Sequence, residues 1–211
     1  MLLNYRAYAC TALLAFGLVL GGCPLPTDAP KEPEEPAIPF QGPLNASFET
    51  SGWWVFASTN SSGCNLGQGD SRARIVSGTG FLPSNGVNYV EFFACNTFTA
   101  PQASAYQDAV DFTHSSTLSF DYSFTGSVGA GGGKATVQIL FTSNGTATLW
   151  TKVIDGNTTL PAQKLSESIT LPSLVTPGRL TITFNVVGGA SASGSITQTR
   201  MTFAMDNLIV R

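Results

Sequence analysis

Charged residues are scarce in this chain, and histidine is nearly missing. Only 11% of the 211 residues are Asp, Glu, Lys or Arg, there is a single histidine, His114, and no run of basic residues occurs. Attraction of nucleic-acid phosphates requires clustered Lys and Arg, so binding to nucleic acid is not expected. One histidine also leaves little room for acid–base or metal chemistry.

The sequence also lacks an apolar run long enough to span a bilayer. Residues 7–20 form an apolar stretch of about fourteen residues, whereas a membrane-spanning helix needs about twenty. Arg6 precedes this stretch, and Leu20-Gly21-Gly22-Cys23 ends it with small residues of the kind that a signal peptidase accepts. The pattern predicts an export signal over residues 1–22.

The ending of this signal resembles the lipobox of bacterial lipoproteins. The resemblance implies that Cys23 receives a lipid on its sulfur and becomes the first residue of the mature protein. The protein would then be lipid-anchored in a bacterial cell envelope, at the outer membrane or cell surface. An ordinary secretory signal, which needs no cysteine at this place, and a transmembrane helix are the alternatives.

Residues 23–43 are rich in proline and glutamate. Proline fixes φ and removes a backbone donor, so this segment cannot sustain a helix or an interior strand. We expect an extended acidic linker, followed by one domain over residues 44–211. That domain contains eight Lys or Arg and nine Asp or Glu, and is therefore close to neutral.

Four cysteines occur in the chain. With Cys10 in the removed signal and Cys23 as the lipid site, Cys64 and Cys95 remain in the domain. Two remaining cysteines in an exported domain most often pair, so we predict a structural disulfide. Closing a loop of about thirty residues would stabilise the domain by roughly 3–4 kcal/mol. Two cysteines are too few for a metal site.

Hydrophobic residues alternate with polar ones at a period of two. The clearest stretches are residues 118–124, 136–141, 180–186 and 201–206. This alternation is typical of antiparallel strands with one face in a core. Turn-forming Gly, Asn and Pro-Gly sequences lie between the stretches. The sequence therefore predicts an all-β fold, a two-sheet antiparallel β-sandwich of jelly-roll type.

Short motifs carry a resemblance to one superfamily. The domain opens with Asn45-Ala-Ser-Phe-Glu49 and closes with Phe203-Ala-Met-Asp206-Asn-Leu-Ile-Val210. This order resembles the galactose-binding-like jelly rolls, which include many carbohydrate-binding modules and anchored bacterial surface domains. In many such domains two acids at these places hold a structural calcium, so the resemblance implies a calcium site at Glu49 and Asp206. The alternative is that Glu49 hydrogen-bonds a turn and Asp206 caps a strand end.

Aromatic and polar side chains suggest a sugar-binding surface. Flat rings stack on pyranoses, and amides and carboxylates bind the hydroxyls. Trp53 and Trp54 are adjacent, so in an extended stretch one faces the core and the other faces out. Core packing is the alternative role for every ring. The candidate ligand-binding residues, expected to line one sheet face, are Trp54, Trp150, Tyr89, Glu91, Asp121, Gln138 and Asn185.

Catalysis has weak support in the sequence. A Ser-His-Asp triad would have to use His114, which no nucleophile-elbow sequence accompanies. Glu91 and Asp121 are two carboxylates of the kind that a glycosidase uses, but no motif brings them together. We therefore predict a non-catalytic, surface-displayed module that binds glycans or another envelope polymer. The alternative is a structural or adhesive module that binds a partner protein or the envelope.

Overall fold

The computed structural model describes part of the chain. The described residues are 42–43, 46–50, 52–58, 64, 70–78, 83–84, 86–96, 101–174, 176–190 and 193–211. The chain divides into two units, Met1–Ile38 and Pro39–Arg211, and every described residue belongs to the second. The predicted signal, Cys23 and all but the last two residues of the predicted linker therefore lie outside the described residues.

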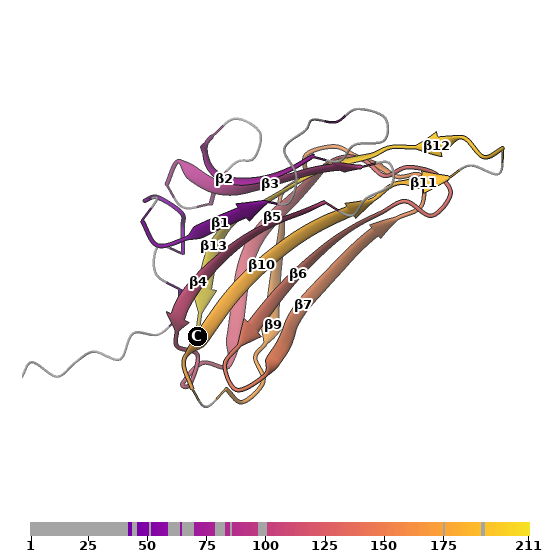
Figure 1. Ribbon diagram of the computed structural model, residues 1–211. Coiled ribbons are helices and arrows are strands. Elements are labelled where there is room, and N and C mark those ends of the chain that lie inside the picture. Colours follow the sequence, from indigo (N-terminus) through magenta and orange to yellow (C-terminus); the bar gives the residue numbers. More distant parts are fainter. Residues whose placement is uncertain are drawn as a thin grey trace, which may run out of the picture. The chain divides into compact units, whose positions relative to one another are not determined.

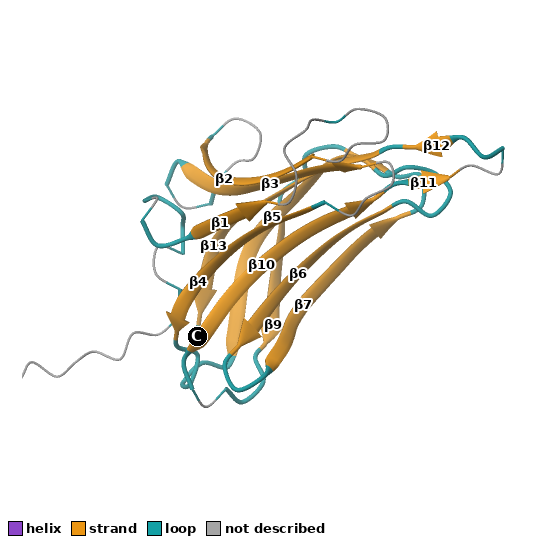
Figure 2. Cartoon of the chain, in the orientation of Figure 1, coloured by secondary structure: helices purple, strands orange, loops and turns teal. Residues whose placement is uncertain are grey.

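Two antiparallel sheets form the described unit, and the chain passes repeatedly from one to the other (Figures 1 and 2). The first sheet contains, in spatial order, β1 (Val55–Ser58), β4 (Gln102–Val110), β10 (Gly178–Val187), β6 (Lys134–Thr142) and β7 (Thr146–Asp155). The second contains β2 (Asp70–Ser77), β3 (Asn88–Asn96), β13 (Thr199–Val210) and β5 (Thr117–Ser127). Beyond β5, this sheet ends in β8 (Thr159–Leu160) and β9 (Leu165–Thr170), while β11 (Gly189–Ala190) and β12 (Ile196–Thr197) pair separately. Within the described part of the chain, no helix is long and apolar enough to cross a membrane.

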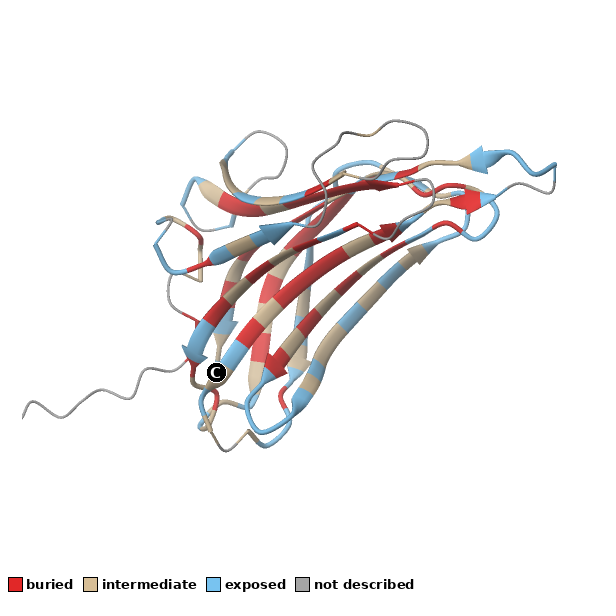
Figure 3. Cartoon of the chain, in the orientation of Figure 1, coloured by how far each residue is buried: buried red, intermediate tan, exposed pale blue. Residues whose placement is uncertain are grey.

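Side chains alternate between core and surface along the strands, as the period of two predicts. On β10, Ile182 and Phe184 are fully buried, while Thr181 between its apolar neighbours faces outward. Figure 3 shows buried bands alternating with less buried ones along the strands. The two sheets meet through aromatic contacts, in which the ring centroids of Phe184 and Phe203 lie 6.1 Å apart. The prediction of a two-sheet antiparallel sandwich is confirmed.

A disulfide joins Cys64 to Cys95, with the Cα atoms 5.8 Å apart. It ties the segment that precedes β2 to the end of β3. The predicted pairing is confirmed.

Candidate functional site

The outer face of the second sheet carries side chains in regular rows. Antiparallel register places residues of β2, β3, β13 and β5 opposite one another, so that each row crosses four strands. One row consists of Arg72, Phe93, Thr202 and Thr125, and the next consists of Arg74, Glu91, Ala204 and Ser123. In the row after these, Val76 is opposite Tyr89, and Asp206 is opposite Asp121.

A pocket of about 140 Å³ lies over β13, between β3 and β5. Short side chains at Thr202 and Ala204 on β13 and at Ser123 and Thr125 on β5 leave this space beside the longer Tyr89 and Glu91 of β3. Drug-sized ligands occupy pockets of about 300 Å³ or more, so this one has room for a single ring-sized group. Its lining residues are Tyr89, Glu91, Ser123, Thr125, Thr202 and Ala204.

Ser123 supplies an unused hydrogen-bonding group to this pocket. Its side chain is 3% exposed, and its Oγ has no hydrogen-bond partner among the residues that the structure describes. Buried polar groups are nearly always hydrogen-bonded, because a buried hydroxyl without a partner costs about 1–3 kcal/mol. The hydroxyl lies at the pocket wall but is closed to solvent in the free protein, so a ligand binds it only after a lining side chain moves aside.

Glu91 offers the pocket an acceptor. Arg74 donates to Glu91 through Nη2 at 3.1 Å and through Nε at 3.3 Å, and both donors contact Oε1. Within the described part of the chain, Oε2 accepts no hydrogen bond. The pocket thus combines a carboxylate oxygen with the hydroxyls of Ser123, Thr125 and Thr202.

A second group of polar residues lies around Asp121 on the same face. Ser166 donates a hydrogen bond to this carboxylate. Burial by itself would raise the pKa of Asp121, but hydrogen bonds from Ser166, Ser84 and Asn207 and the charge of Lys164 together lower it. Asp121 is consequently a carboxylate at neutral pH.

Glu49 and Asp206, the predicted calcium ligands, both accept hydrogen bonds from the segment that leads into β3. Glu49 Oε1 accepts from the backbone N–H groups of Val87 and Asn88, each at 3.0 Å. Asp206 Oδ2 accepts from the backbone N–H of Ser84 at 2.6 Å. Among the described residues, no group of three or more His, Cys, Asp or Glu gathers that could hold a metal. These side chains alone do not complete the six to eight oxygens that calcium requires, and a calcium ion stays a prediction.

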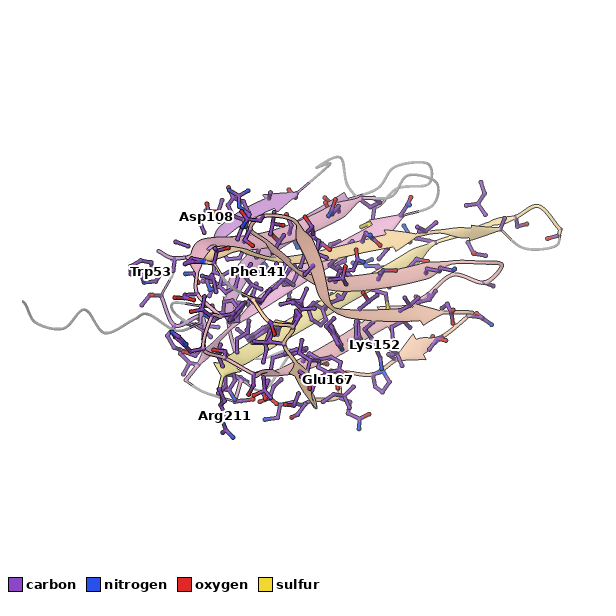
Figure 4. All side chains as sticks on the ribbon, turned by 90° about the horizontal axis from the view of Figure 1, so that it is seen from below. Trp53, Asp108, Phe141, Lys152, Glu167 and Arg211 are labelled. Atoms are coloured by element: carbon purple, nitrogen blue, oxygen red, sulfur yellow. A yellow bond between two sulfur atoms is a disulfide. The ribbon has the colours of Figure 1, made fainter. Side chains whose placement is uncertain are left out.

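The exposure of the tryptophan rings differs from the prediction. Trp54 is 4% exposed and packs on Phe48 in the core, so the expectation of an exposed Trp54 ring is wrong. Trp150 is half-buried and packs against the core, with its ring edge-on to Phe120 and Tyr122, so the expectation that it lines an outer sheet face is also wrong. The exposed ring is that of Trp53, which is 53% exposed and points away from the core (Figure 4). As predicted, one of the two adjacent tryptophans faces the core and the other faces out, but the one that faces the core is Trp54.

The expected polar face is divided between the two sheets. Glu91 and Asp121 lie on the outer face of the second sheet, whereas Gln138 and Asn185 lie on the outer face of the first. The expectation that all four line one surface is therefore wrong. Alternation along a strand shows which residues point outward, but it does not show to which sheet the strand belongs.

Tyr89 faces outward from β3 and lines the pocket, yet its ring is only 2% exposed. It packs with Ala204 and Val76 on the same face. Tyr89 therefore borders the pocket without presenting a bare ring.

Sequence reasoning missed four pocket residues, Ser123, Thr125, Thr202 and Ala204. Their outward positions in alternating stretches were visible in the sequence. The sequence did not show that these residues line one pocket, because that depends on the pairing of β13 with β5.

No protein-family model and no curated protein matches this sequence. Among solved structures, one similar chain comes from work on the promiscuous specificity of carbohydrate-binding modules of the β-sandwich superfamily. The identity is 13% and the TM-score 0.47, and the match covers 81% of this chain but only 63% of the other. A family 28 module specific for non-crystalline cellulose matches at 16% identity and TM-score 0.44, over 81% of this chain and 97% of that one.

The cleaved adhesin domain of Lys-gingipain from Porphyromonas gingivalis is also similar. It matches at 12% identity and TM-score 0.45, over 77% of this chain and 92% of the other. Likenesses at these identities and TM-scores are too weak to carry a functional conclusion. The fold class follows from the strand pairings themselves.

Proposed function

We propose that the domain is a non-catalytic module that binds glycans through the pocket on the outer face of the second sheet. The observation that carries the proposal is the pocket itself, which brings the Glu91 carboxylate together with the hydroxyls of Thr125 and Thr202 and with Ser123, whose buried Oγ has no hydrogen-bond partner among the described residues. A sugar presents several hydroxyls, each able to donate and accept, and so matches a pocket of hydroxyls and a carboxylate.

Glu91 and Asp121, the two predicted ligand-binding carboxylates on this face, support binding without chemistry. A glycosidase needs one carboxylic acid with a raised pKa to protonate the leaving oxygen. The pKa of Asp121 is instead lowered, because hydrogen bonds from Ser166, Ser84 and Asn207 outweigh the effect of burial. Asp121 therefore lacks the raised pKa that a general acid needs. Glu91 forms an ion pair with Arg74.

Display on a cell envelope completes the proposal. It rests on the lipobox resemblance at Cys23, which predicts a lipid-anchored protein with a proline-rich linker before the domain. Metabolic labelling with a fatty-acid analogue tests this part, and we expect label on the wild type and none on Cys23→Ser. Unlabelled wild-type protein would contradict the anchor and leave the pocket unaffected.

The binding proposal is tested by filling the pocket. Ala204 lies on the pocket floor, on the face opposite to the core, so Ala204→Leu should block the pocket without disturbing core packing. Thr181→Leu, outward on β10 of the first sheet, is the matched control. In affinity electrophoresis over a panel of neutral and acidic polysaccharides, we expect the wild type and the control to be retained by the same polymers.

Ala204→Leu should lose that retention while its melting temperature stays near that of the wild type. Equal retention of Ala204→Leu and wild type would place binding elsewhere. Retention by no polymer would contradict the proposal and favour the structural or adhesive module.

A further inference from the structure

Beside the pocket, two arginines share one aromatic ring. The Cζ atoms of Arg72 and Arg200 lie 4.6 Å and 5.5 Å from the centroid of the Phe93 ring. Phe93 is 6% exposed beneath them, and both arginines are exposed. By the sum of these distances, the two Cζ atoms are no more than about 10 Å apart. Phe93 is opposite Thr202, which lines the pocket, so the two cations lie next to the pocket although neither of them lines it.

Neither arginine is neutralised by a carboxylate within the described residues. The ion pairs there join Arg74 to Glu91 and Arg179 to Asp108. Asp70 lies in the row of Arg200, on the edge strand, and forms no ion pair with it. The domain as a whole is close to neutral, so the positive charge of Arg72 and Arg200 is a local feature of this face.

The first sheet contains a neutralised counterpart of this arrangement. Arg179 has its Cζ 4.2 Å from the centroid of the Tyr106 ring, and Asp108 accepts hydrogen bonds from its Nε at 2.6 Å and its Nη2 at 3.1 Å. There a protein carboxylate binds the stacked guanidinium. Arg72 and Arg200 are held over their ring in the same way, but the carboxylate is missing among the described residues.

Stacking on an aromatic ring fixes a guanidinium while its N–H groups stay available to bind an anion. Two such groups beside a pocket of hydroxyls suit an anionic group carried on a sugar. Asp121, one row beyond Ser123, is a carboxylate and repels an anion from the other end of the pocket. The charges therefore favour one orientation of an acidic ligand.

We infer that the glycan bound at this pocket is acidic, a polysaccharide with uronate or sulfate groups, and that its anionic group lies between Arg72 and Arg200. The inference rests on the proposed function, because it names the class of glycan that the same pocket selects. Arginine matches carboxylate and sulfate oxygens with paired hydrogen bonds, and charged hydrogen bonds are about twice as strong as neutral ones.

The test compares charged polymers with their uncharged counterparts. The probes are polygalacturonate, alginate and dextran sulfate, beside carboxyl-reduced polygalacturonate, carboxyl-reduced alginate and dextran. We expect retention of the protein by at least one acidic polymer, weaker or absent retention by its counterpart, and weaker binding at higher salt. Arg72→Gln and Arg200→Gln should each weaken binding about tenfold or more.

Arg179→Gln is the matched control, since it removes a stacked arginine from the opposite sheet, and its binding should equal that of the wild type. Melting temperatures verify that each variant is folded. Equal retention by charged and uncharged polymers would overturn the inference and leave the proposed function standing. Equal retention by duplex DNA at the same salt would also overturn it, by showing unselective attraction of polyanions. Retention by none of the polymers would overturn the inference and the proposed function together.

Discussion

Replacing Ser123 with alanine should stabilise the free protein and weaken its binding to glycan. The side chain is buried on the outer face of β5, and in the described part of the chain its Oγ has no hydrogen-bond partner. A buried hydroxyl without a hydrogen bond costs about 1–3 kcal/mol, and alanine removes it while keeping Cβ in place. We expect the free energy of unfolding to rise by about 1 kcal/mol, which for a domain of this size raises the melting temperature by about 2–4 °C.

The same substitution removes a hydrogen bond that the ligand would make. A neutral hydrogen bond contributes about 0.5–1.5 kcal/mol, so the affinity for a retained polysaccharide should fall about two- to tenfold. Thermal unfolding of the free protein and calorimetric titration with the polysaccharide measure the two effects separately. A rise in the free energy of unfolding together with a fall in affinity for the polysaccharide is the result that supports the reasoning.

Ser119→Ala is the matched control on the same strand and face. Ser119 Oγ donates to Ser168 Oγ at 2.9 Å, so this substitution breaks a formed hydrogen bond instead of removing an unused hydroxyl. Its melting temperature should stay unchanged or fall slightly. If Ser123→Ala lowers the melting temperature as much as Ser119→Ala does, the Ser123 hydroxyl has a partner and the reasoning is refuted.

Three further predictions concern stability. Reduction of the Cys64–Cys95 disulfide should lower the free energy of unfolding by about 3–4 kcal/mol, and a melting temperature unchanged by reductant would contradict this. The pKa of Asp121 is lowered in the folded protein, so its contribution is complete above the ordinary value of 3.8 and is lost as pH falls through the folded value. Asp121→Asn should therefore lose less stability below about pH 4 than the wild type, and identical acid profiles would argue against this contribution. The calcium prediction for Glu49 and Asp206 expects chelation to lower the melting temperature and added calcium to restore it; an unchanged value would assign both carboxylates to hydrogen bonds alone.

The fold was predictable because strand periodicity is local. Alternation over residues 118–124 and 180–186 identified β5 and β10, with Phe120 and Ile182 correctly placed in the core. The disulfide was predictable because the lipobox resemblance left two cysteines in the domain. The strand prediction needed only residues that are adjacent in the sequence, and the disulfide prediction needed only the number of cysteines in the domain.

The site was only partly predictable because it depends on pairing between distant strands. Glu91 and Ser123 lie on either side of Ala204 only because β13 pairs with both β3 and β5. Asn185 is on the opposite sheet because β10 pairs with β4 and β6. Tyr89 is outward by alternation, yet it is buried because Ala204 and Val76 pack against it. No pattern within a single strand contains this information.

The most direct test of the glycan-binding pocket is a map of amide chemical-shift changes when the shortest oligosaccharide of a retained polymer is added to the domain. We predict changes centred on Glu91, Ser123 and Thr202, on the outer face of the second sheet. Changes centred on Gln138 and Asn185 of the first sheet, or no changes at saturating oligosaccharide, would contradict the account.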